Sequence, residues 1–215
     1  MNVPRFVRRR ARRPHRALAP LAVLALAAAA GGCASAGLPP PPDAAARAAA
    51  TSSYSGRLRV SLRAPDFRAR SAVLIAFARP DALRIEVPGP GGARLVAVTR
   101  AGRLTAVFPG ERAFFSGEAT PDALESLLGV PLAPAEVIDL LLGVPSPRLR
   151  RYEARWGPDL PRRIDATLPD GGRLRLTVDE AARGAELSPA AFDEPPRAGY
   201  RQVDAEEART LWSGR

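Results

Sequence analysis

The fold class is decided by the ten residues 54–63, which read YSGRLRVSLR. Leu58, Val60 and Leu62 alternate there with polar residues, most of them arginine, so one face of the segment is apolar and the other is charged. A period of two is typical of a β-strand that lies on a core with one face and in water with the other. The stretch therefore predicts a sheet with an apolar inner face.

The same pattern continues along the chain in short segments that are separated by turn residues. Arg79-Pro80-Asp81, residues 88–92, Pro109-Gly110 and Asp170-Gly171-Gly172 are turns of this kind. Short strands joined by tight turns favour antiparallel pairing over parallel units with crossover helices. The further predicted strands are residues 67–78, 83–87, 94–99, 103–108, 112–116, 149–156, 163–168 and 173–179.

Two helices are predicted within residues 120–145. Thr120-Pro121-Asp122 combines an N-cap hydroxyl, a proline at the first helical position and a carboxylate near the positive end of the helix dipole, and Gly129 ends this helix. A second helix runs from Pro134 to Gly143 and is apolar on most sides. Such a helix must be covered on both sides, so it either forms a lid over the sheet or completes a filled core. Periodicity alone leaves both possibilities open.

The C-terminal region carries weaker signals. Prolines within residues 187–200 predict an extended or edge segment, and residues 205–212 predict a short helix. We expect the β-domain to span residues 54–203, with residues 204–215 as a C-terminal tail.

The first 32 residues have the composition of a secretory signal peptide. Residues 1–16 are rich in arginine, and the apolar run 17–30 is too short for a membrane-spanning helix. Small residues directly before Cys33 resemble the bacterial lipobox, although Ala30 stands where that motif usually has leucine. This resemblance implies that Cys33 is lipidated and becomes the first residue of the mature protein. The alternative is an ordinary signal peptide that leaves a free thiol.

Residues 33–53 are rich in proline and alanine and predict a flexible tether with a short helix at residues 43–50. About 20 extended residues reach up to about 65 Å. An anchored domain on such a tether can meet soluble partners.

Charge and composition exclude several function classes. The chain has a formal net charge of +10, but seven of its 32 basic residues precede residue 33, where no acidic residue falls. The remaining 25 basic residues nearly balance the 22 acidic ones, which argues against a nucleic-acid partner. His15 is the only histidine and Cys33 the only cysteine, so imidazole catalysis, zinc sites and internal disulfides are not expected. With no catalytic motif either, we predict no enzymatic activity, no cofactor and no metal.

Arginines occupy alternate positions of the predicted strands. They are most simply a solvated outer face, and the alternative is a weak attraction to anionic headgroups or to an acidic partner. The residues concerned are Arg57, Arg59, Arg63, Arg68, Arg70, Arg173 and Arg175.

The middle of the chain resembles the LolA/LolB-like lipoprotein localisation superfamily, including its LolB family of outer-membrane lipoprotein receptors. Gly129-Val130-Pro131 is followed, after ten residues, by Leu142-Gly143-Val144-Pro145, and the turn Gly89-Pro90-Gly91-Gly92 precedes both. The opening Ser55-Gly56-Arg57 and the closing Gly199-Tyr200-Arg201 also fit the superfamily. The resemblance spans residues 54–203.

This resemblance implies an incomplete antiparallel β-barrel that is wrapped around an apolar cavity and covered by a helical lid insert. It also implies a monomeric lipoprotein of the outer membrane, facing the periplasm, that accepts lipid-modified proteins from the periplasmic carrier LolA and delivers them to that membrane. Ala34 is not the aspartate associated with inner-membrane retention. The residues implied to face the cavity are Leu58, Val60, Leu62, Val73, Ile75, Phe77, Leu83, Ile85, Leu95 and Ala97, and those of the lid are Leu124, Leu127, Val137, Ile138 and Leu141.

One position departs from the receptor family. Where that family has a protruding bulky apolar residue that assists membrane insertion, this chain has Pro90 between glycines. Either another apolar element such as Phe114-Phe115 replaces it, or the chain binds lipid without inserting lipoproteins. The second reading describes a superfamily relative that binds another lipid or serves as a structural part of an envelope complex.

Overall fold

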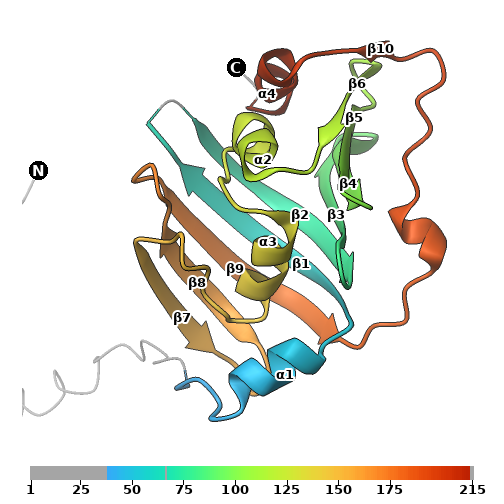
Figure 1. The fold of residues 1–215 in the computed structure, drawn as a ribbon. Coiled ribbons are helices and arrows are strands. Elements are labelled where there is room, and N and C mark those ends of the chain that lie inside the picture. The colour runs from blue at the N-terminus through green and yellow to red at the C-terminus, as the bar shows by residue number, and fades with distance from the viewer. Residues whose placement is uncertain (1–37, 66, 214–215) are drawn as a thin grey trace, which may run out of the picture. The chain divides into compact units, whose positions relative to one another are not determined.

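The computed structural model describes residues 38–65 and 67–213, whose arrangement is shown in Figure 1. The predicted signal peptide and the predicted lipidation site Cys33 lie outside the described residues, so both stay predictions. Within the described ranges, no helix has both the length and the apolar content that a membrane crossing requires.

The described chain is mainly β, with one ten-stranded sheet and four α-helices. The strands lie side by side in the order β10-β6-β5-β4-β3-β2-β1-β9-β8-β7. β7 and β10 form the two edges, so the sheet is not closed into a barrel. The strand bounds are β1 Ser53–Arg63, β2 Arg68–Ala78, β3 Ala82–Gly89, β4 Gly92–Arg100, β5 Arg103–Phe108, β6 Ala113–Glu118, β7 Arg151–Trp156, β8 Pro161–Thr167, β9 Arg173–Arg183 and β10 Arg201–Gln202.

The predicted mainly β fold class is thereby confirmed, with one correction. All neighbouring strands pair antiparallel except β10, which pairs parallel with β6. The sheet is therefore mixed, because the long segment after β9 brings the chain back beside β6 in the same direction. Tight turns predict antiparallel neighbours only where they join the two strands directly.

β1 lies at the centre of the sheet and shows the predicted alternation. It pairs with β2 on one side and β9 on the other, with Leu58 opposite Val73 and Val178. Leu58 and Leu62 are buried, whereas Arg59 and Arg63 are exposed. We call the face that carries Leu58 the inner face and the opposite one the outer face.

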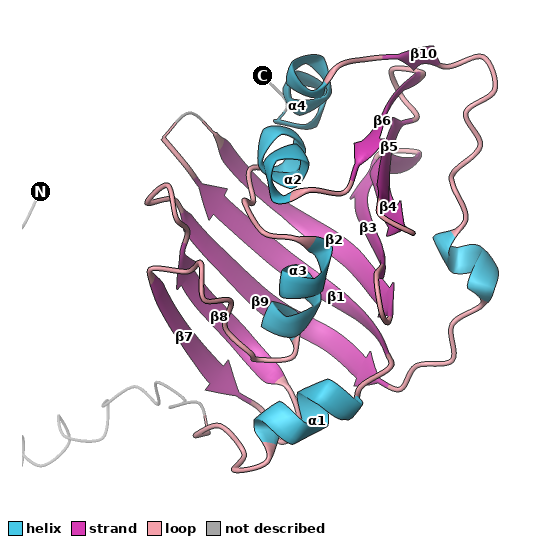
Figure 2. Cartoon of the chain, viewed as in Figure 1, coloured by secondary structure: helices cyan, strands magenta, loops and turns pink. Residues whose placement is uncertain are grey.

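The two predicted helices are α2, Pro121–Leu128, and α3, Pro134–Leu141. Both lie over the inner face of the curved sheet (Figure 2). Thr120 Oγ1 accepts a hydrogen bond from the Ala123 N–H at 3.2 Å, which confirms it as the N-cap. Glu136 Oε2 accepts one from the Ala133 N–H at 2.8 Å and so satisfies a donor at the start of α3.

The glycines that follow the two helices are required by close packing. Gly129 has φ 71° and Gly143 has φ 87°, values that L-residues rarely adopt. A Cβ atom on Gly129 would lie 2.7 Å from Phe67 Cδ1, and one on Gly143 would lie 2.4 Å from the Trp156 ring. The repeated Gly-Val-Pro motif thus marks two points of close contact between the helical insert and the β-strand region.

The segment before β1 is part of the folded body. Helix α1, Ala44–Ala50, buries Ala48, and the Leu38 N–H donates to the Trp156 carbonyl at 3.2 Å. The short helix predicted at residues 43–50 is thus present as α1, whereas the flexible tether predicted around it is, from Leu38 onward, part of the folded body. Alanines and prolines carry too little periodicity to show that such a segment packs on a neighbour.

The C-terminal region also packs more extensively than predicted. Residues 184–203 cross the outer face of β3 and β4, where the short 3₁₀ helix η1, Pro189–Phe192, places Phe192 against Val96 and Val98. The chain then reaches β10 and ends in α4, Ala205–Ser213, which packs on α2 (Figure 1). The outer face of β4 is consequently buried, and residues 204–213 belong to the domain.

Candidate functional site

A cavity of about 90 Å³ lies between the inner face of the sheet and the helices, and all of its lining residues are hydrophobic. The strands supply Leu58, Val60, Leu62, Ala69, Val73, Ile75, Ile85, Val87, Leu95, Leu174 and Leu176. The helices and the connection between α2 and α3 supply Leu124, Leu128, Val130, Val137, Leu140, Leu141 and Trp212. The interior is thus neither completely filled nor widely open.

Most residues that the resemblance assigned to a cavity do line this one. The exceptions on the strands are Phe77, Leu83 and Ala97, which are buried in the core beside it. Phe77 stacks on Tyr54, with ring centroids 5.4 Å apart and planes 1° from parallel. This aromatic pair fills the interior at that end of β1 and β2 and leaves no space there.

The proposed lid residues divide in the same way. Leu124, Val137 and Leu141 line the cavity, whereas Leu127 and Ile138 are fully buried beside it. Polar contacts hold α3 to its surroundings. Asp139 on α3 pairs with Arg79 at 2.7 Å, and Arg79 also donates to the Thr51 carbonyl at 3.0 Å.

Trp212 on α4 is a lining residue that sequence reasoning missed. Its ring centroid lies 6.3 Å from that of Phe67 and 5.4 Å from the Arg94 guanidinium carbon, and Arg94 Nη2 donates to the Trp212 carbonyl at 2.7 Å. Within the described part of the chain, the buried Trp212 Nε1 has no hydrogen-bond partner. A tryptophan near the end of the sequence was the only available signal.

The turn that carries Pro90 joins β3 to β4. Pro90 is exposed, and no bulky apolar residue flanks it. Phe114 and Phe115 do not form a protruding element in its place, because both are half-buried within β6. The Arg197 guanidinium covers the Phe114 ring at 4.9 Å. Their half-buried placement gives no support to the alternative in which this pair replaces the insertion residue.

Two tyrosines have a strongly raised pKa, the buried Tyr54 and the half-buried Tyr152. Burial raises the pKa of Tyr54 and of Tyr152 to about 12. Both hydroxyls lack a hydrogen-bond partner among the described residues. No cluster of three or more His, Cys, Asp or Glu able to hold a metal occurs in the ranges that the structure describes.

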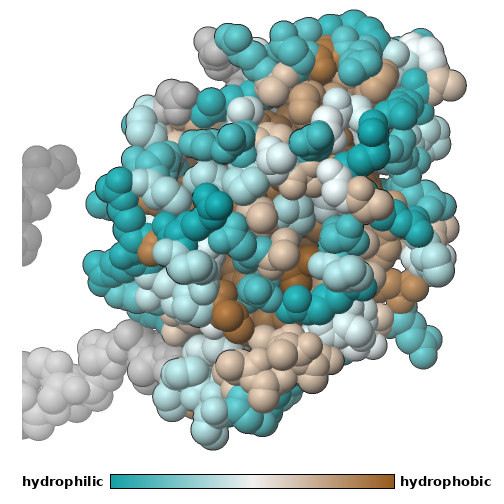
Figure 3. Space-filling view, viewed as in Figure 1, coloured by the Kyte–Doolittle hydropathy of each residue, from teal (hydrophilic) through white to brown (hydrophobic). Residues whose placement is uncertain are grey.

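The surface around β7 is mostly hydrophilic in the view of Figure 3, whereas hydrophobic side chains reach the surface between α3 and α1. The predicted outward arginines Arg57, Arg59, Arg63, Arg68, Arg70, Arg173 and Arg175 all lie on β1, β2 or β9. Arg59 pairs with Asp179 at 2.8 Å and Arg175 with Asp165 at 2.6 Å. Part of this array is thus neutralised within the sheet.

Comparison with known proteins adds little. No protein-family model matches the chain, and no curated protein matches it. Among solved structures, an uncharacterized conserved protein from Thermus thermophilus is similar at a TM-score of 0.43 and 12% identity, over 75% of this chain and 94% of that one. A similarity of this size carries no argument about function.

Proposed function

We propose that this chain is a non-enzymatic lipoprotein of the LolA/LolB-like kind that binds acyl chains in the cavity beneath α2, α3 and α4. The observation that supports this function is the cavity itself, about 90 Å³ of space with an entirely hydrophobic lining. In this proposal the open sheet is an incomplete barrel around that cavity, and the helices form its lid. Hydrocarbon gains free energy by entering such a space, at about 0.8 kcal/mol per buried methylene.

A complete acyl chain needs more room than this cavity offers. A cavity of about 150 Å³ accepts a single benzene molecule, so about 90 Å³ holds only a small part of a long chain. Entry therefore requires part of the lid to move outward. We assign this motion to α2 and α4, which pack on each other, because α3 is held by the Arg79–Asp139 ion pair.

Trp212 supplies the polar contact in this scheme. Its Nε1–H is buried without a partner among the described residues, and the ring lines the cavity. A buried donor without an acceptor costs about 1 to 3 kcal/mol. The carbonyl oxygen of an acyl ester or amide would accept that hydrogen bond and so remove the cost.

The first candidate function is that of a receptor, which uses acyl-chain binding to transport lipid-modified proteins. The chain is anchored through lipidated Cys33 in the outer membrane, faces the periplasm and acts as a monomer. It accepts lipid-modified proteins from the carrier LolA and passes them to the membrane. No covalent step is needed, because transfer follows from the difference in acyl-chain affinity between successive sites.

Pro90 favours a second candidate function. The exposed turn between β3 and β4 offers no bulky apolar side chain for insertion into a bilayer. A lipoprotein that binds another lipid, or that forms a structural part of an envelope complex, needs no such residue. The two candidates share the cavity and differ in the cargo.

A cavity-filling variant tests the shared part. Ala69 lines the cavity on β2, whereas Ala72 on the same strand is exposed on the outer face. We expect Cys33→Ser protein, purified natively, to carry lipid or acylated polypeptide that mass spectrometry detects. Adding Ala69→Phe should abolish this occupancy, and the control Ala72→Phe should retain it. Equal occupancy in both variants, or an empty parent protein, would contradict the proposal.

Depletion in cells separates the two candidates. Cells that lose a receptor should accumulate lipoproteins in complex with soluble LolA, which fractionation and immunoblotting detect. Normal lipoprotein sorting after depletion would reject the receptor and leave the lipid-binding or structural role.

A further inference from the structure

A groove of about 500 Å³ lies on the outer face of the sheet, on the side away from the cavity lid, and is formed by β1, β7, β8 and β9. Its charged lining consists of six arginines and only two carboxylates. The arginines are Arg63, Arg151, Arg155, Arg163, Arg173 and Arg175, and the carboxylates are Glu153 and Asp165. At neutral pH the groove therefore carries a local excess of four positive charges.

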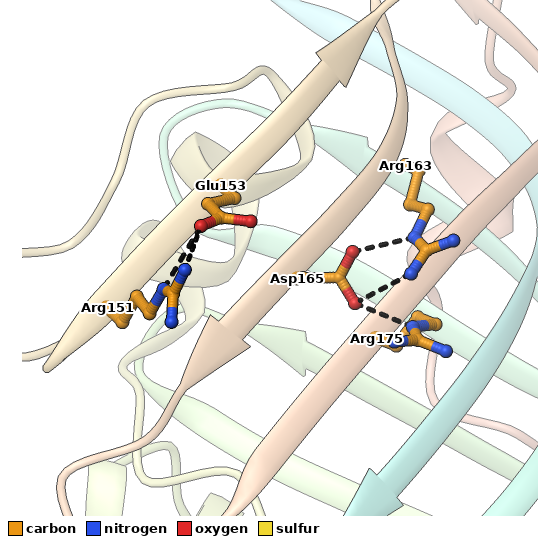
Figure 4. Close-up of polar contacts among 5 residues, drawn as sticks. All are labelled: Arg151, Glu153, Arg163, Asp165 and Arg175. Carbon is orange, nitrogen blue, oxygen red and sulfur yellow. Dashed lines mark hydrogen bonds and ion pairs between the residues drawn. The ribbon is translucent and has the colours of Figure 1, made fainter. Parts of the chain in front are cut away.

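The carboxylates fix the positions of three guanidinium groups. Asp165 on β8 accepts hydrogen bonds from Arg163 Nε and from Arg175 Nε, each at 2.6 Å, and Arg151 pairs with Glu153 on β7 (Figure 4). Burial by itself would raise the pKa of Asp165, but the hydrogen bonds from the two arginines outweigh it and hold that pKa below its ordinary value. Asp165 thus stays charged and keeps both arginines in place through the physiological pH range.

Three arginines of the groove remain available to a ligand. Arg63, Arg155 and Arg173 are exposed and have no ion pair within residues 38–65 and 67–213. They come from β1, β7 and β9, so they are spread across the whole groove. A planar guanidinium group binds phosphate oxygens through two parallel N–H donors.

The start of the described chain lies beside this groove. Leu38 pairs with Trp156, the neighbour of Arg155 on the edge strand β7, and its side chain is 55% exposed. Only Ala34 to Gly37 separate Leu38 from Cys33 in the sequence, and a connection of that length spans at most about 18 Å. A lipid on Cys33 would therefore keep β7 close to the bilayer surface.

We propose that the arginine groove binds the phosphates of anionic lipid headgroups and lays the β7–β9 side of the sheet against the membrane. The nearness of the bilayer rests on the lipidation in the proposed function, whereas the charge of the groove does not. An acidic protein segment would meet the same charges, but the short connection from Cys33 favours the membrane. With this orientation, the helices over the inner face remain turned away from the headgroups.

Vesicle binding by the full chain with Cys33→Ser tests the groove without the anchor. We expect this protein to co-sediment with phosphatidylcholine vesicles that contain phosphatidylglycerol, and not with vesicles of phosphatidylcholine alone. The triple variant Arg63→Gln, Arg155→Gln, Arg173→Gln should bind about a hundredfold more weakly, since each arginine near an anionic surface contributes about a factor of five. A matched control changes the exposed Arg100, Arg103 and Arg112 to Gln and loses the same charge near β4, β5 and β6. The control should keep nearly all of the affinity.

Any of four results would overturn the assignment. One is equal binding by the groove variant and the control, which would show that vesicle binding depends on the total charge of the protein and not on the groove. Another is equal binding to neutral and anionic vesicles. The third is binding to soluble polyglutamate without any binding to vesicles, which would assign the groove to an acidic protein. Inorganic phosphate at constant ionic strength should compete only weakly, and complete displacement by it would assign the groove to free phosphate. Lipid occupancy of the cavity is measured on the same variants and should not change. The proposal for the groove and the proposal for the cavity can therefore be disproved independently of each other.

Discussion

The interior of the sheet is filled at the Tyr54 end of β1 and hollow at the Leu62 end, although the same two strands form both. At the filled end, Tyr54 stacks on Phe77, and Gly56 leaves room for the Tyr54 ring, because a Cβ there would lie 2.8 Å from Tyr54 Oη. At the hollow end, Leu62 faces Ala69 across the ladder, and both line the cavity. Large rings fill space that aliphatic side chains of the same strands leave empty.

Truncation should therefore cost more in the aromatic pair than at the cavity wall. Phe77→Ala removes a fully buried ring from the stacked pair and should lower the free energy of unfolding by about 3 to 5 kcal/mol. Ile85→Ala, at the cavity wall, removes a half-buried side chain and should cost about 2 kcal/mol, the low end of its usual range. Urea unfolding measures both, and equal costs would contradict the contrast between the aromatic pair and the cavity wall.

Alkaline pH should weaken the filled end. A tyrosine in the unfolded chain ionises near pH 10, whereas burial raises the pKa of Tyr54 to about 12. Its contribution is fully present below about pH 10 and is lost as the pH rises toward 12, which amounts to about 2 to 3 kcal/mol. Denaturant unfolding between these pH values measures the loss. Tyr54→Phe should remove its own share of this pH dependence, while the share of Tyr152 remains. Tyr200→Phe serves as the control because that ring is not buried.

The smallest effect is expected at the lid over the hollow end. Thr120→Ala removes the N-cap hydrogen bond of α2 and should cost about 1 kcal/mol of stability. If α2 moves when acyl chains enter, this variant should take up and release a fluorescent fatty acid faster than the parent protein. The matched change Ser188→Ala removes a similar cap from η1 on the outer face and should leave both rates unchanged. Identical kinetics in the two variants would remove α2 from the proposed gate.

Sequence reasoning found most elements because their signals are local. The alternation of Leu58, Val60 and Leu62 indicates a strand without reference to any partner, and Thr120 with Gly129 marks both ends of α2. The segments that it misjudged depend on distant contacts. Leu38 pairs with Trp156, which lies far away in the chain, and no local sequence pattern predicts this pairing.

The sequence by itself determined that this protein has a mainly β body with an apolar inner face and a helical insert. Those features follow from periodicity, capping residues and composition, which each segment carries alone. Only the tertiary structure decided that the aromatic pair Tyr54 and Phe77 fills one end of the interior, that Trp212 lines the cavity, and that the arginines of four strands meet in one groove. Volume left between side chains and charge gathered from separate strands are properties of packing, so no single segment contains them.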